Sequence, residues 1–585
     1  MRFFTFLCFL LVTCTTLISQ TEGLPVGFAP GEQEKMPYYL ENLEISGITT
    51  PPGLVPRTMA EWEESQAVVV AWISYPAVLA EIVRYAREEC RVIIICTNIQ
   101  TVKTYLTSKN VDFSSNVEFV TGTYNTVWLR DYGPNPVYLK GVDSLALVDW
   151  IYNRPRPLDD KIPDLIGSYM NLPVFSTSAA PYDLVNTGGN YMSDGMGTAF
   201  ASKLVLDENG PNNKYGFSNL SETEVDSMMY KFMGIKKYIL METLPYDGIH
   251  HIDMHMKLLD EKTLIVGKYP DGTADGPQIE ANIQYVLSNF QTTFGTPFRV
   301  IRVTMPPDVS GYYPDQGGDY RTFANALILN KSVLLPIYEA KYDTTAVNIW
   351  QNAMPGYKIR TIDCNSMISA SGAIHCITHE IGVQNPLLIQ HLSLSDVNGS
   401  FPLGYPVDAF IQHKSGIQLA TLYYRLEGET VWKSVNMEEK NALTHSFSGF
   451  IPEQVNGSIV EYYIEATANT GKVQTKPMTA PDGFYSFKVE FITATNYLHN
   501  NSKLGEIYPN PAGAITCIPV SALTIENISI CLVDVFGRTV KTIFKGNSTI
   551  GDHNYFFDAS DLIPGSYIVK YSSENAVSSK VLMIK

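Results

Sequence analysis

The chain has few cysteines and little positive charge for its length. Of its 585 residues, 8 are cysteines, and Lys and Arg together number 42 against 59 for Asp and Glu. The formal net charge of −17 argues against general nucleic-acid binding, which needs a basic surface. The cysteines are too few for a disulfide framework, and none forms the CxxC pair of a structural zinc site. An acidic surface mildly favours cationic ligands instead.

Long apolar runs are also missing, except at the N-terminus. Residues 3–18 form a mostly apolar stretch after a positive start, and Ser19–Gln20 offers a cleavage point, so residues 1–19 are predicted to be a signal peptide. A membrane anchor is disfavoured because the run is too short to span a bilayer, while a lipoprotein acylated at Cys14 remains an alternative. No later segment is typical of a transmembrane helix.

Composition and periodicity divide the rest of the chain into four parts. Residues 20–50 are polar and resemble a propeptide or an N-terminal arm. In residues 51–392, apolar strand-like runs alternate with helical patterns, which predicts an α/β domain. The predicted strands are 67–73, 91–96, 144–150, 263–267, 299–304 and 326–336, and the predicted helices are 76–90, 221–232, 277–290 and 342–353.

Two all-β parts complete the chain. Residues 393–494 alternate apolar and polar positions between turn-rich stretches, which predicts a small antiparallel sandwich. A polar linker follows, and residues 504–585 form a further region without helical patterns. Cys90 and Cys96 border a strand-like run and are expected to be buried, with a disulfide between them as the alternative.

Four short polar clusters in the α/β region are suited to handling a guanidinium group. They are WLRDYGP around Asp131, HHID with His251 and Asp253, FANALILN around Asn325, and GAIHCITHE around Cys376. A guanidinium is planar and cationic, and carboxylates match its fork of donors. Two carboxylates with a Cys and a His therefore predict an enzyme that cleaves a C–N bond of arginine or a related compound.

Each cluster also has a structural interpretation. Asp131 is expected at a strand end, where it could instead pair with Arg130 or cap the turn. His251 and Asp253 are two residues apart, so they share one side of a strand if the segment is extended. The sequence HHIDMH also allows a metal site through His250, Asp253 and His255.

The cysteine cluster has a structural interpretation as well. A buried Cys such as Cys376 is typically inert, and His375 and His379 would lower the pKa of its thiol only if they face it. Gly188 and Gly189 in NTGGN would let a backbone approach a ligand closely, although any tight turn uses the same residues. Trp128 beside Asp131 is placed to stack on the apolar stem of an arginine.

Together these stretches resemble the guanidino-group-modifying family with the pentein fold, in particular agmatine deiminases and Porphyromonas-type peptidylarginine deiminases. The resemblance covers about residues 55–390 and includes EWEESQAVVVAW at 61–72. It implies an α/β (α+β) pentein, a five-bladed ββαβ propeller with a central active site. No fivefold repeat is readable in the sequence.

The resemblance also implies a role for each residue. Cys376 corresponds to the nucleophile, His251 to the acid/base, Asp131 and Asp253 to the guanidinium clamps, and Asn325 to a supporting polar residue. The implied reaction passes through a covalent thiouronium and yields citrulline. It requires no metal or organic cofactor, although a structural calcium or sodium ion is compatible with the sequence.

The sequence YNRPRP places Arg154 and Arg156 two residues apart, where paired arginines suit a carboxylate. They would repel the cationic tail of agmatine. In the secreted deiminase branch, matching arginines bind the C-terminal carboxylate, so the resemblance implies peptides and proteins that end in arginine. A solvated Pro-rich turn is the alternative.

The sequence of the C-terminal region indicates where the protein is located. Its YPNPA, DVFGRTV and final KVLMIK resemble the sorting domain of type IX secretion substrates, and residues 393–494 resemble an immunoglobulin-like module. The expected partners are arginine-containing peptides and the type IX machinery, and the expected location is secreted or cell-surface. The competing hypotheses are an agmatine deiminase, a surface cysteine protease and a non-catalytic adhesin.

Overall fold

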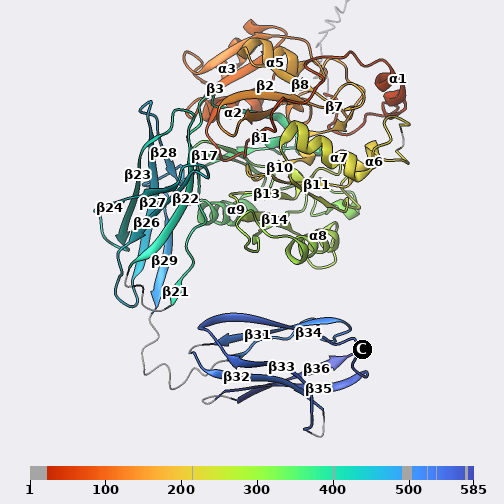
Figure 1. Ribbon diagram of the computed structural model, residues 1–585. Helices are drawn as coiled ribbons and strands as arrows, with labels where there is room; N and C mark the ends of the chain where they lie inside the picture. Colours follow the sequence, from red (N-terminus) through yellow and green to blue (C-terminus); the bar gives the residue numbers. More distant parts are fainter. Residues whose placement is uncertain are drawn as a thin grey trace, which may run out of the picture. The chain divides into compact units, whose positions relative to one another are not determined.

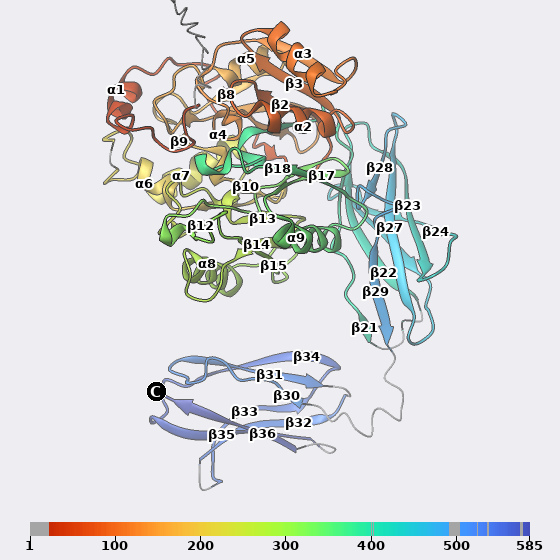
Figure 2. The same cartoon turned by 180° about the vertical axis from the view of Figure 1, so that it is seen from behind.

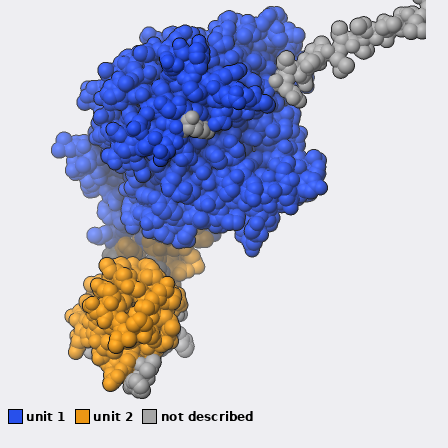
Figure 3. Space-filling model, turned by 90° about the vertical axis from the view of Figure 1, so that its right-hand side faces the viewer, with its two compact units in different colours: residues 1–395, 403–452, 460–487 blue, residues 396–402, 453–459, 488–585 orange. Residues whose placement is uncertain are grey.

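The computed structural model describes residues 23–213, 215–398, 401, 403–490, 503–522, 525–534, 537–573 and 577–585. The predicted signal peptide lies outside these residues, as does most of the polar linker. The chain forms two compact units, one of residues 1–395, 403–452 and 460–487 and the other of residues 396–402, 453–459 and 488–585 (Figure 3). No helix in the described ranges is both long and apolar enough to cross a membrane.

Five sheets of three or four strands make up most of the α/β part of the first unit, and β7 (Ile151–Tyr152) and β9 (Val185–Asn186) pair in a further two-stranded sheet. In four of the five sheets, an antiparallel strand pair is followed along the chain by a helix and then by a parallel strand. In the remaining sheet, the antiparallel partner of β2 is β19, the last strand of the α/β part, and β3 is the parallel strand. The helices α3 and α8 lie at opposite extremes of this part in both Figure 1 and Figure 2. The strand orders are β19-β2-β3-β4, β1-β5-β6-β8, β10-β11-β12, β13-β14-β15 and β16-β17-β18.

The first two sheets lie in the N-terminal half of this part. Strands β2 and β3 are buried along nearly their whole length, as expected for parallel strands covered on both faces. Their elements are β1 (Arg57–Thr58), β2 (Ser65–Ala71), α2 (Pro76–Ala86), β3 (Arg91–Cys96), α3 (Ile99–Ser108), β4 (Val117–Thr121), α4 (Leu129–Tyr132), β5 (Asn135–Leu139), β6 (Ser144–Asp149), β7 (Ile151–Tyr152), α5 (Ile162–Met170), β8 (Val174–Ser176) and β9 (Val185–Asn186).

The other three sheets follow in chain order. A capping box begins the predicted helix at 221–232, because Ser221 and Glu224 bond each other's backbone at the start of α7. The elements are β10 (Met192–Ser193), β11 (Thr198–Ser202), α6 (Leu204–Asn209), α7 (Glu222–Met228), β12 (Lys237–Met241), β13 (Met256–Leu258), β14 (Thr263–Lys268), α8 (Gly276–Asn289), β15 (Arg299–Thr304), β16 (Leu327–Leu329), β17 (Ser332–Ile337), α9 (Ala340–Ala353), β18 (Lys358–Asp363) and β19 (His379–Gly382).

Two local predictions and one alternative need correction. The run 326–336 is not one strand but the hairpin β16–β17, which turns at Asn330 in a left-handed conformation with φ of 50°. The predicted helix at 221–232 is α-helical only to Met228 and continues as a π-helical turn over Met229–Met233. Cys90 and Cys96 are buried and free, so the alternative of a disulfide between them is wrong.

The N-terminal arm is ordered in the described part. It contains a short helix, α1 (Met36–Glu41), preceded by a 3-10 turn over Gln33–Lys35. Met36, Tyr39 and Leu40 are buried in a small apolar cluster with Ile151 and Val185. The arm is therefore anchored to the α/β part through side chains next to the predicted Arg154–Arg156 motif.

Two β regions follow the α/β part. The first has two sheets with the orders β20-β22-β26-β25 and β21-β29-β27-β23-β24, and β28 pairs with β27. Alternate residues of β22 are buried, which is the pattern of a strand with one face on a core. Its strands are β20 (Leu388–Gln390), β21 (Val397–Asn398), β22 (Tyr405–Gln412), β23 (Ile417–Leu426), β24 (Lys433–Asn436), β25 (Glu438–Asn441), β26 (Ser446–Ile451), β27 (Ile459–Ala468), β28 (Val473–Lys476) and β29 (Tyr485–Glu490).

The C-terminal region is also composed of antiparallel strands. They form two sheets with the orders β30-β31-β34 and β33-β32-β35-β36, and a separate apolar cluster lies within the region. Its strands are β30 (Lys503–Leu504), β31 (Ile515–Ala522), β32 (Asn527–Val533), β33 (Thr539–Asn547), β34 (Gly551–Asp558), β35 (Gly565–Ser572) and β36 (Val577–Ile584).

Gly234 allows a comparison that isolates one backbone contact. Gly234 and Gly272 both have φ of +72°, but a Cβ at Gly234 would lie 1.8 Å from the carbonyl oxygen of Pro56, whereas a Cβ at Gly272 would meet nothing within 4 Å. Alanine at either position costs about 1–2 kcal/mol for the left-handed backbone, and overpacking at Gly234 adds about 1–3 kcal/mol. Gly234→Ala should therefore lower the denaturant midpoint of the first unit clearly more than Gly272→Ala does. Equal midpoints, measured by tryptophan fluorescence, would contradict the contact.

Candidate active site

The four polar clusters converge in the interior of the α/β part. Asp131 lies on the single helical turn α4, His251 precedes a 3-10 turn over Ile252–Met254, and Cys376 lies within a 3-10 turn directly before β19. Asn325 lies in the loop before β16. Asp131 is 4% exposed, and the other four predicted catalytic residues are not exposed at all. The HHID segment is thus a turn and not the predicted strand, and Asp131 lies within a helical turn and not at a strand end.

The thiol of Cys376 contacts two of the predicted residues. Its Sγ lies 3.2 Å from Nδ2 of Asn325 and 3.6 Å from Oδ2 of Asp253. Oδ1 of Asn325 accepts hydrogen bonds from the backbone N–H groups of His375 (3.0 Å) and Cys376 (3.4 Å). Asn325 therefore fixes both the thiol and the turn that carries it.

The two carboxylates each have one oxygen engaged by protein and one that is not. Oδ1 of Asp131 accepts a hydrogen bond from the backbone of Gly189 (3.2 Å) and lies 3.4 Å from Nδ1 of His251. Oδ2 of Asp131, Oδ1 of Asp253 and both ring nitrogens of His251 are buried, and they make no hydrogen bond within the described residues. Buried polar atoms without partners are rare and call for an explanation. A cationic fork of N–H donors between the two carboxylates would supply the missing bonds.

The protonation states follow from burial. Burial raises the pKa of Asp131 to about 6, against the opposing charge of Arg154. Burial, and then the charges of Arg154 and His250, lower the pKa of His251 well below its usual value. Burial, and then Asp253 and Asp131, raise the pKa of the Cys376 thiol. These directions correspond to a protonated Cys376 thiol and a neutral His251 imidazole, and a bound cation would favour the thiolate.

A second layer of ionisable groups holds Asp253. Oδ2 of Asp253 lies 2.7 Å from Nδ1 of His375, whose Nε2 lies 3.1 Å from Oε2 of Glu61. That carboxylate in turn pairs with Nζ of Lys257 at 2.6 Å. His375 therefore faces Asp253 and Glu61, and its ring orients a carboxylate. Sequence reasoning gave no role to Glu61 or Lys257, because neither lies in the four polar clusters, although Glu61 begins the EWEESQAVVVAW stretch.

Arg130 does not pair with Asp131, contrary to the structural interpretation of the WLRDYGP motif. Its guanidinium forms a buried ion pair with Glu380, with N–O distances of 2.6 and 3.3 Å. Its Nε also donates to the carbonyl of His375 (3.3 Å). The pair thus ties α4 to the strand that follows Cys376, and it leaves Asp131 available for the site.

The two glycines of NTGGN lie against the predicted catalytic residues. A Cβ at Gly188 would lie 2.1 Å from the carbonyl oxygen of Arg130, and one at Gly189 would lie 2.4 Å from Nδ1 of His251 and 2.7 Å from Oδ1 of Asp131. Both glycines are buried. They allow close approach of the backbone to the predicted catalytic side chains, whereas the sequence had suggested close approach to a ligand.

The three remaining predicted residues, Trp128, Arg154 and Arg156, are buried and contact the N-terminal arm. The YNRPRP segment is a tight turn, in which the N–H of Arg156 donates to the carbonyl of Arg154 (2.7 Å), and both arginines are buried, so it is the Pro-rich turn of the alternative without its exposure to solvent. The guanidinium of Arg156 pairs with the carboxylate of Glu32. Arg156 is therefore bound to a carboxylate, as predicted for this motif, but the carboxylate belongs to the chain itself.

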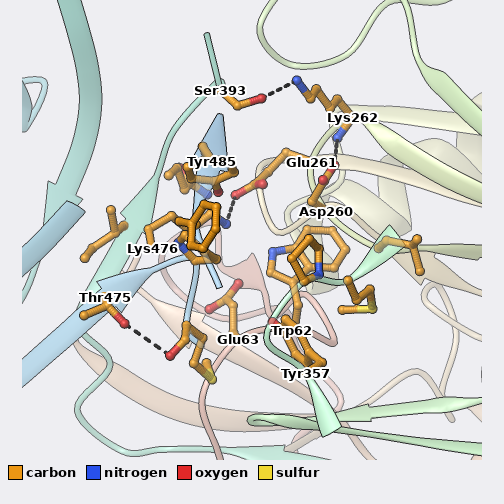
Figure 4. A pocket seen from close by; sticks show the side chains of 18 of the residues that line it. Trp62, Glu63, Asp260, Glu261, Lys262, Tyr357, Ser393, Thr475, Lys476 and Tyr485 are labelled. Atoms are coloured by element: carbon orange, nitrogen blue, oxygen red, sulfur yellow. Dashed lines mark hydrogen bonds and ion pairs between the residues drawn. The ribbon is translucent and has the colours of Figure 1, made fainter. Parts of the chain in front are cut away.

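A cavity of about 350 Å³ lies apart from this cluster (Figure 4). Its lining includes Trp62, Glu261, Tyr357, Lys476 and Tyr485, but none of the predicted site residues. Glu261 and Lys476 form an ion pair of 2.8 Å across it. An open cavity is often the first candidate for an active site, yet here the chemically complete group is the buried cluster. The described residues contain no group of three His, Cys, Asp or Glu side chains arranged to hold a metal ion, and this applies to the predicted alternative in HHIDMH.

Two family matches cover most of the chain. Residues 57–382 match the family described as Porphyromonas-type peptidyl-arginine deiminase, and residues 506–585 match the family described as secretion system C-terminal sorting domain. The first match includes every predicted site residue.

Individual relatives agree with the first match. A protein of Mycoplasma capricolum subsp. capricolum, named "Putative agmatine deiminase", is 25% identical over 293 residues, which are 45% of this chain and 77% of that protein. A protein of Vibrio parahaemolyticus with the same name is 26% identical over 292 residues, covering 46% and 78%. A solved structure described as "X-ray structure of putative agmatine deiminase" aligns with a TM-score of 0.50 and 19% identity, over 57% of this chain and 98% of that chain. This last similarity concerns the fold.

The close approach of Gly189 to the catalytic side chains gives a direct test of the cluster. Gly189→Ala would push a methyl group against His251 and Asp131, and a displacement of about 1 Å can cost roughly 100-fold in rate. We expect ammonia release from an arginine substrate to fall by at least that factor while circular dichroism stays unchanged. Gly53→Ala is the matched control, because a Cβ there meets nothing within 4 Å. Full activity of Gly189→Ala would contradict the assignment.

Proposed function

Because the chain belongs to the Porphyromonas-type peptidyl-arginine deiminase family, we propose that it hydrolyses arginine in peptides and proteins to citrulline and ammonia, with a preference for C-terminal arginine. At the coarser level, the chain is a guanidino-group-modifying deiminase, a hydrolase that acts on C–N bonds in amidines. Its sorting domain indicates type IX secretion and a cell-surface location. These matches confirm the resemblances to the deiminase family and to the type IX sorting domain.

One observation carries the proposal. The thiol of Cys376 is 3.6 Å from Oδ2 of Asp253, the oxygen that faces His375. Oδ1 of Asp253 and Oδ2 of Asp131 are buried and make no hydrogen bond within the described residues. A guanidinium held in its plane by both carboxylates would satisfy these oxygens. Its central carbon would then be presented to the sulfur.

The reaction uses only the chain's own groups and water. Cys376 gives its proton to neutral His251, and the thiolate attacks the guanidinium carbon to form a neutral tetrahedral adduct. His251 returns the proton to one amino group, the C–N bond breaks, and ammonia leaves a cationic thiouronium. His251 then takes a proton from water, and the hydroxide attacks the same carbon. The C–S bond breaks while the proton of the new hydroxyl group passes to the sulfur, which releases citrulline and restores the thiol. Protonated His251 finally loses its proton through water to the ammonia, which becomes ammonium. Over the whole cycle, a guanidinium and water become a urea group and ammonium.

The substrate preference rests on Arg154 and Arg156. Two buried guanidinium groups beside the site favour the carboxylate of a peptide that ends in arginine. They disfavour the cationic tail of agmatine. The names of the Mycoplasma and Vibrio relatives keep agmatine deiminase as a second candidate. A cysteine protease would have no use for two guanidinium clamps and would need an oxyanion hole instead.

We also propose the finer architecture that the resemblance implied. The five ββαβ sheets and the pairing of β19 with β2 support a five-bladed propeller over residues 51–392. Two antiparallel sheets support an immunoglobulin-like sandwich over residues 393–494, and residues 504–585 form the sorting domain. A signal peptide at 1–19 and type IX machinery as partner complete the proposal. The reaction needs no cofactor, and a structural calcium or sodium ion is compatible with it.

Substrate comparison tests the proposed function. The wild-type protein should form citrulline from a peptide ending in arginine at least tenfold more efficiently than it converts agmatine, because only the peptide supplies a carboxylate. Cys376→Ala should abolish both reactions, and Arg154→Ala should mainly raise KM for the peptide. Equal kcat/KM for the two substrates would contradict the carboxylate role, and peptide cleavage without citrulline would contradict deiminase chemistry.

The pH dependence reports on Asp131. Its pKa of about 6 means that, in the free enzyme, the carboxylate is charged above pH 6 and neutral below it. A neutral Asp131 does not pair with a cation, so kcat/KM should fall about tenfold for each pH unit below 6. The measurement is an initial-rate profile from pH 4.5 to 8 on an arginine-ending peptide. A flat profile through this range would show that Asp131 does not bind the substrate in its charged form.

A further inference from the structure

The N-terminal segment Leu24–Glu32, here called the covering segment, occupies hydrogen-bonding positions of the predicted substrate site. Nε1 of Trp128 donates to the carbonyl of Leu24 (2.8 Å), and Nε of Arg154 donates to that of Val26 (3.1 Å). Nη2 of Arg156 donates to the carbonyls of Pro25 and Gly27, both at 2.8 Å. All three predicted substrate-binding side chains that carry donors are thus bound to one stretch of main chain.

The covering segment also supplies a carboxylate. Oε1 and Oε2 of Glu32 lie 2.9 and 3.0 Å from Nε and Nη2 of Arg156, and both side chains are buried. Burial alone would raise the pKa of Glu32, but the bonds from Arg156 and from the backbone of Ala29 outweigh it and lower the pKa. Glu32 is therefore ionised at neutral pH, and its charge and geometry are those of a peptide's terminal carboxylate.

The covering segment lies beside the catalytic turns. The N–H of Val26 donates to the carbonyl of Ala370 (3.5 Å), and a Cβ at Gly27 would lie 3.5 Å from the side chain of Ile249. The ring of Phe28 lies over the guanidinium of Arg154 at 4.4 Å. Ile249 is two residues before His251, and Ala370 is six before Cys376, so the segment forms a wall next to both turns.

The covering segment is a surface strap with buried anchors. Leu24, Pro30 and Gly31 are exposed, whereas Val26 and Glu32 are buried. Because Cys376, His251 and Asp253 are wholly shielded from solvent in this arrangement, a guanidinium reaches them only after part of the surrounding chain moves. The covering segment is held mainly by hydrogen bonds and one ion pair and has few buried apolar contacts. Moving such a segment costs less free energy than moving a packed element.

We propose that the covering segment is an internal pseudosubstrate, in which Glu32 takes the place of the substrate's C-terminal carboxylate on Arg156 and keeps the enzyme in a low-activity form. The inference rests on the proposed deiminase function and adds its regulation. A substrate ending in arginine must displace Glu32, so the covering segment acts as a tethered competitor. Cutting the chain between the segment and β1 removes the tether and raises activity.

Cutting the chain after folding is the first part of the test. A protease recognition sequence is inserted between Glu44 and Ile45, both of which are exposed. The full-length protein is purified, cut and separated from the released segment. We expect kcat/KM for an arginine-ending peptide to rise at least tenfold, mainly through a lower KM. An uncut sample of the same insertion variant is the control.

Glu32→Gln in the uncut chain is the second part. The substitution keeps the shape of the side chain but removes its charge, so KM for the same peptide should fall roughly tenfold. Glu34→Gln is the matched control, because Glu34 lies two residues away and is exposed. A synthetic peptide of residues 23–42, added to the cut enzyme, should inhibit competitively, and its Glu32→Gln version should inhibit at least tenfold less.

The possible results separate the inference from the proposed function. Citrulline formation that is unchanged by cutting and is not inhibited by the added peptide overturns the pseudosubstrate. Absence of citrulline from every substrate, in cut and uncut enzyme alike, overturns the deiminase function instead. Should Glu32→Gln fail to fold, as judged by thermal unfolding, inhibition of the cut enzyme by the two synthetic peptides still decides the inference.

Discussion

The burial of Asp253 is the interaction on which the site depends. A carboxylate without solvent costs several kcal/mol unless it is paired and hydrogen-bonded. Asp253 meets this requirement on one side through His375, which also reaches Glu61, and Glu61 is held by Lys257 and by the backbone N–H of Ile328. Lys257 lies on β13, Ile328 on β16 and His375 in the turn before β19. All three contact the carboxylate of Glu61. The other oxygen of Asp253 remains available to a cation. Part of the free energy of binding that cation would come from giving this buried oxygen a partner.

The arginines around the site divide into two kinds. Arg130 is neutralised within the α/β part by Glu380, and it holds the Cys376 turn through the carbonyl of His375. Arg154 and Arg156 reach out to the N-terminal arm instead. The guanidinium of Arg130 therefore stabilises the α/β part itself, whereas those of Arg154 and Arg156 bind the N-terminal arm. The sequence neighbours of these arginines, Leu129 and Asp131 for Arg130 and at least one proline for each of the other two, do not show which partners they bind.

Local features were predictable from sequence where one physical cause dominates. The apolar runs RVIIIC and RVIRVT coincide with β3 and β15, and the Ser221–Glu224 capping box fixes the start of α7. The five polar residues of the cluster were also predicted from the short motifs in which they lie, and they are Asp131, His251, Asp253, Asn325 and Cys376. The fivefold repeat was not readable, because strands such as β10 and β13 are only two or three residues long and carry no periodicity. The partners of Arg130, His375 and Arg156 were not readable either, since each lies more than 100 positions away in the chain.

The pairing of β19 with β2 ties the assembly of the site to the order of synthesis. β19 begins three residues after Cys376, and the amide of Gln66 donates to the carbonyl of Gly382, 316 positions away. The cysteine reaches its place only when the last strand of the α/β part closes on one of its first strands. Contacts so distant in sequence form slowly. A partly made or partly unfolded chain consequently lacks the contacts that position Cys376, because these form only when β19 pairs with β2.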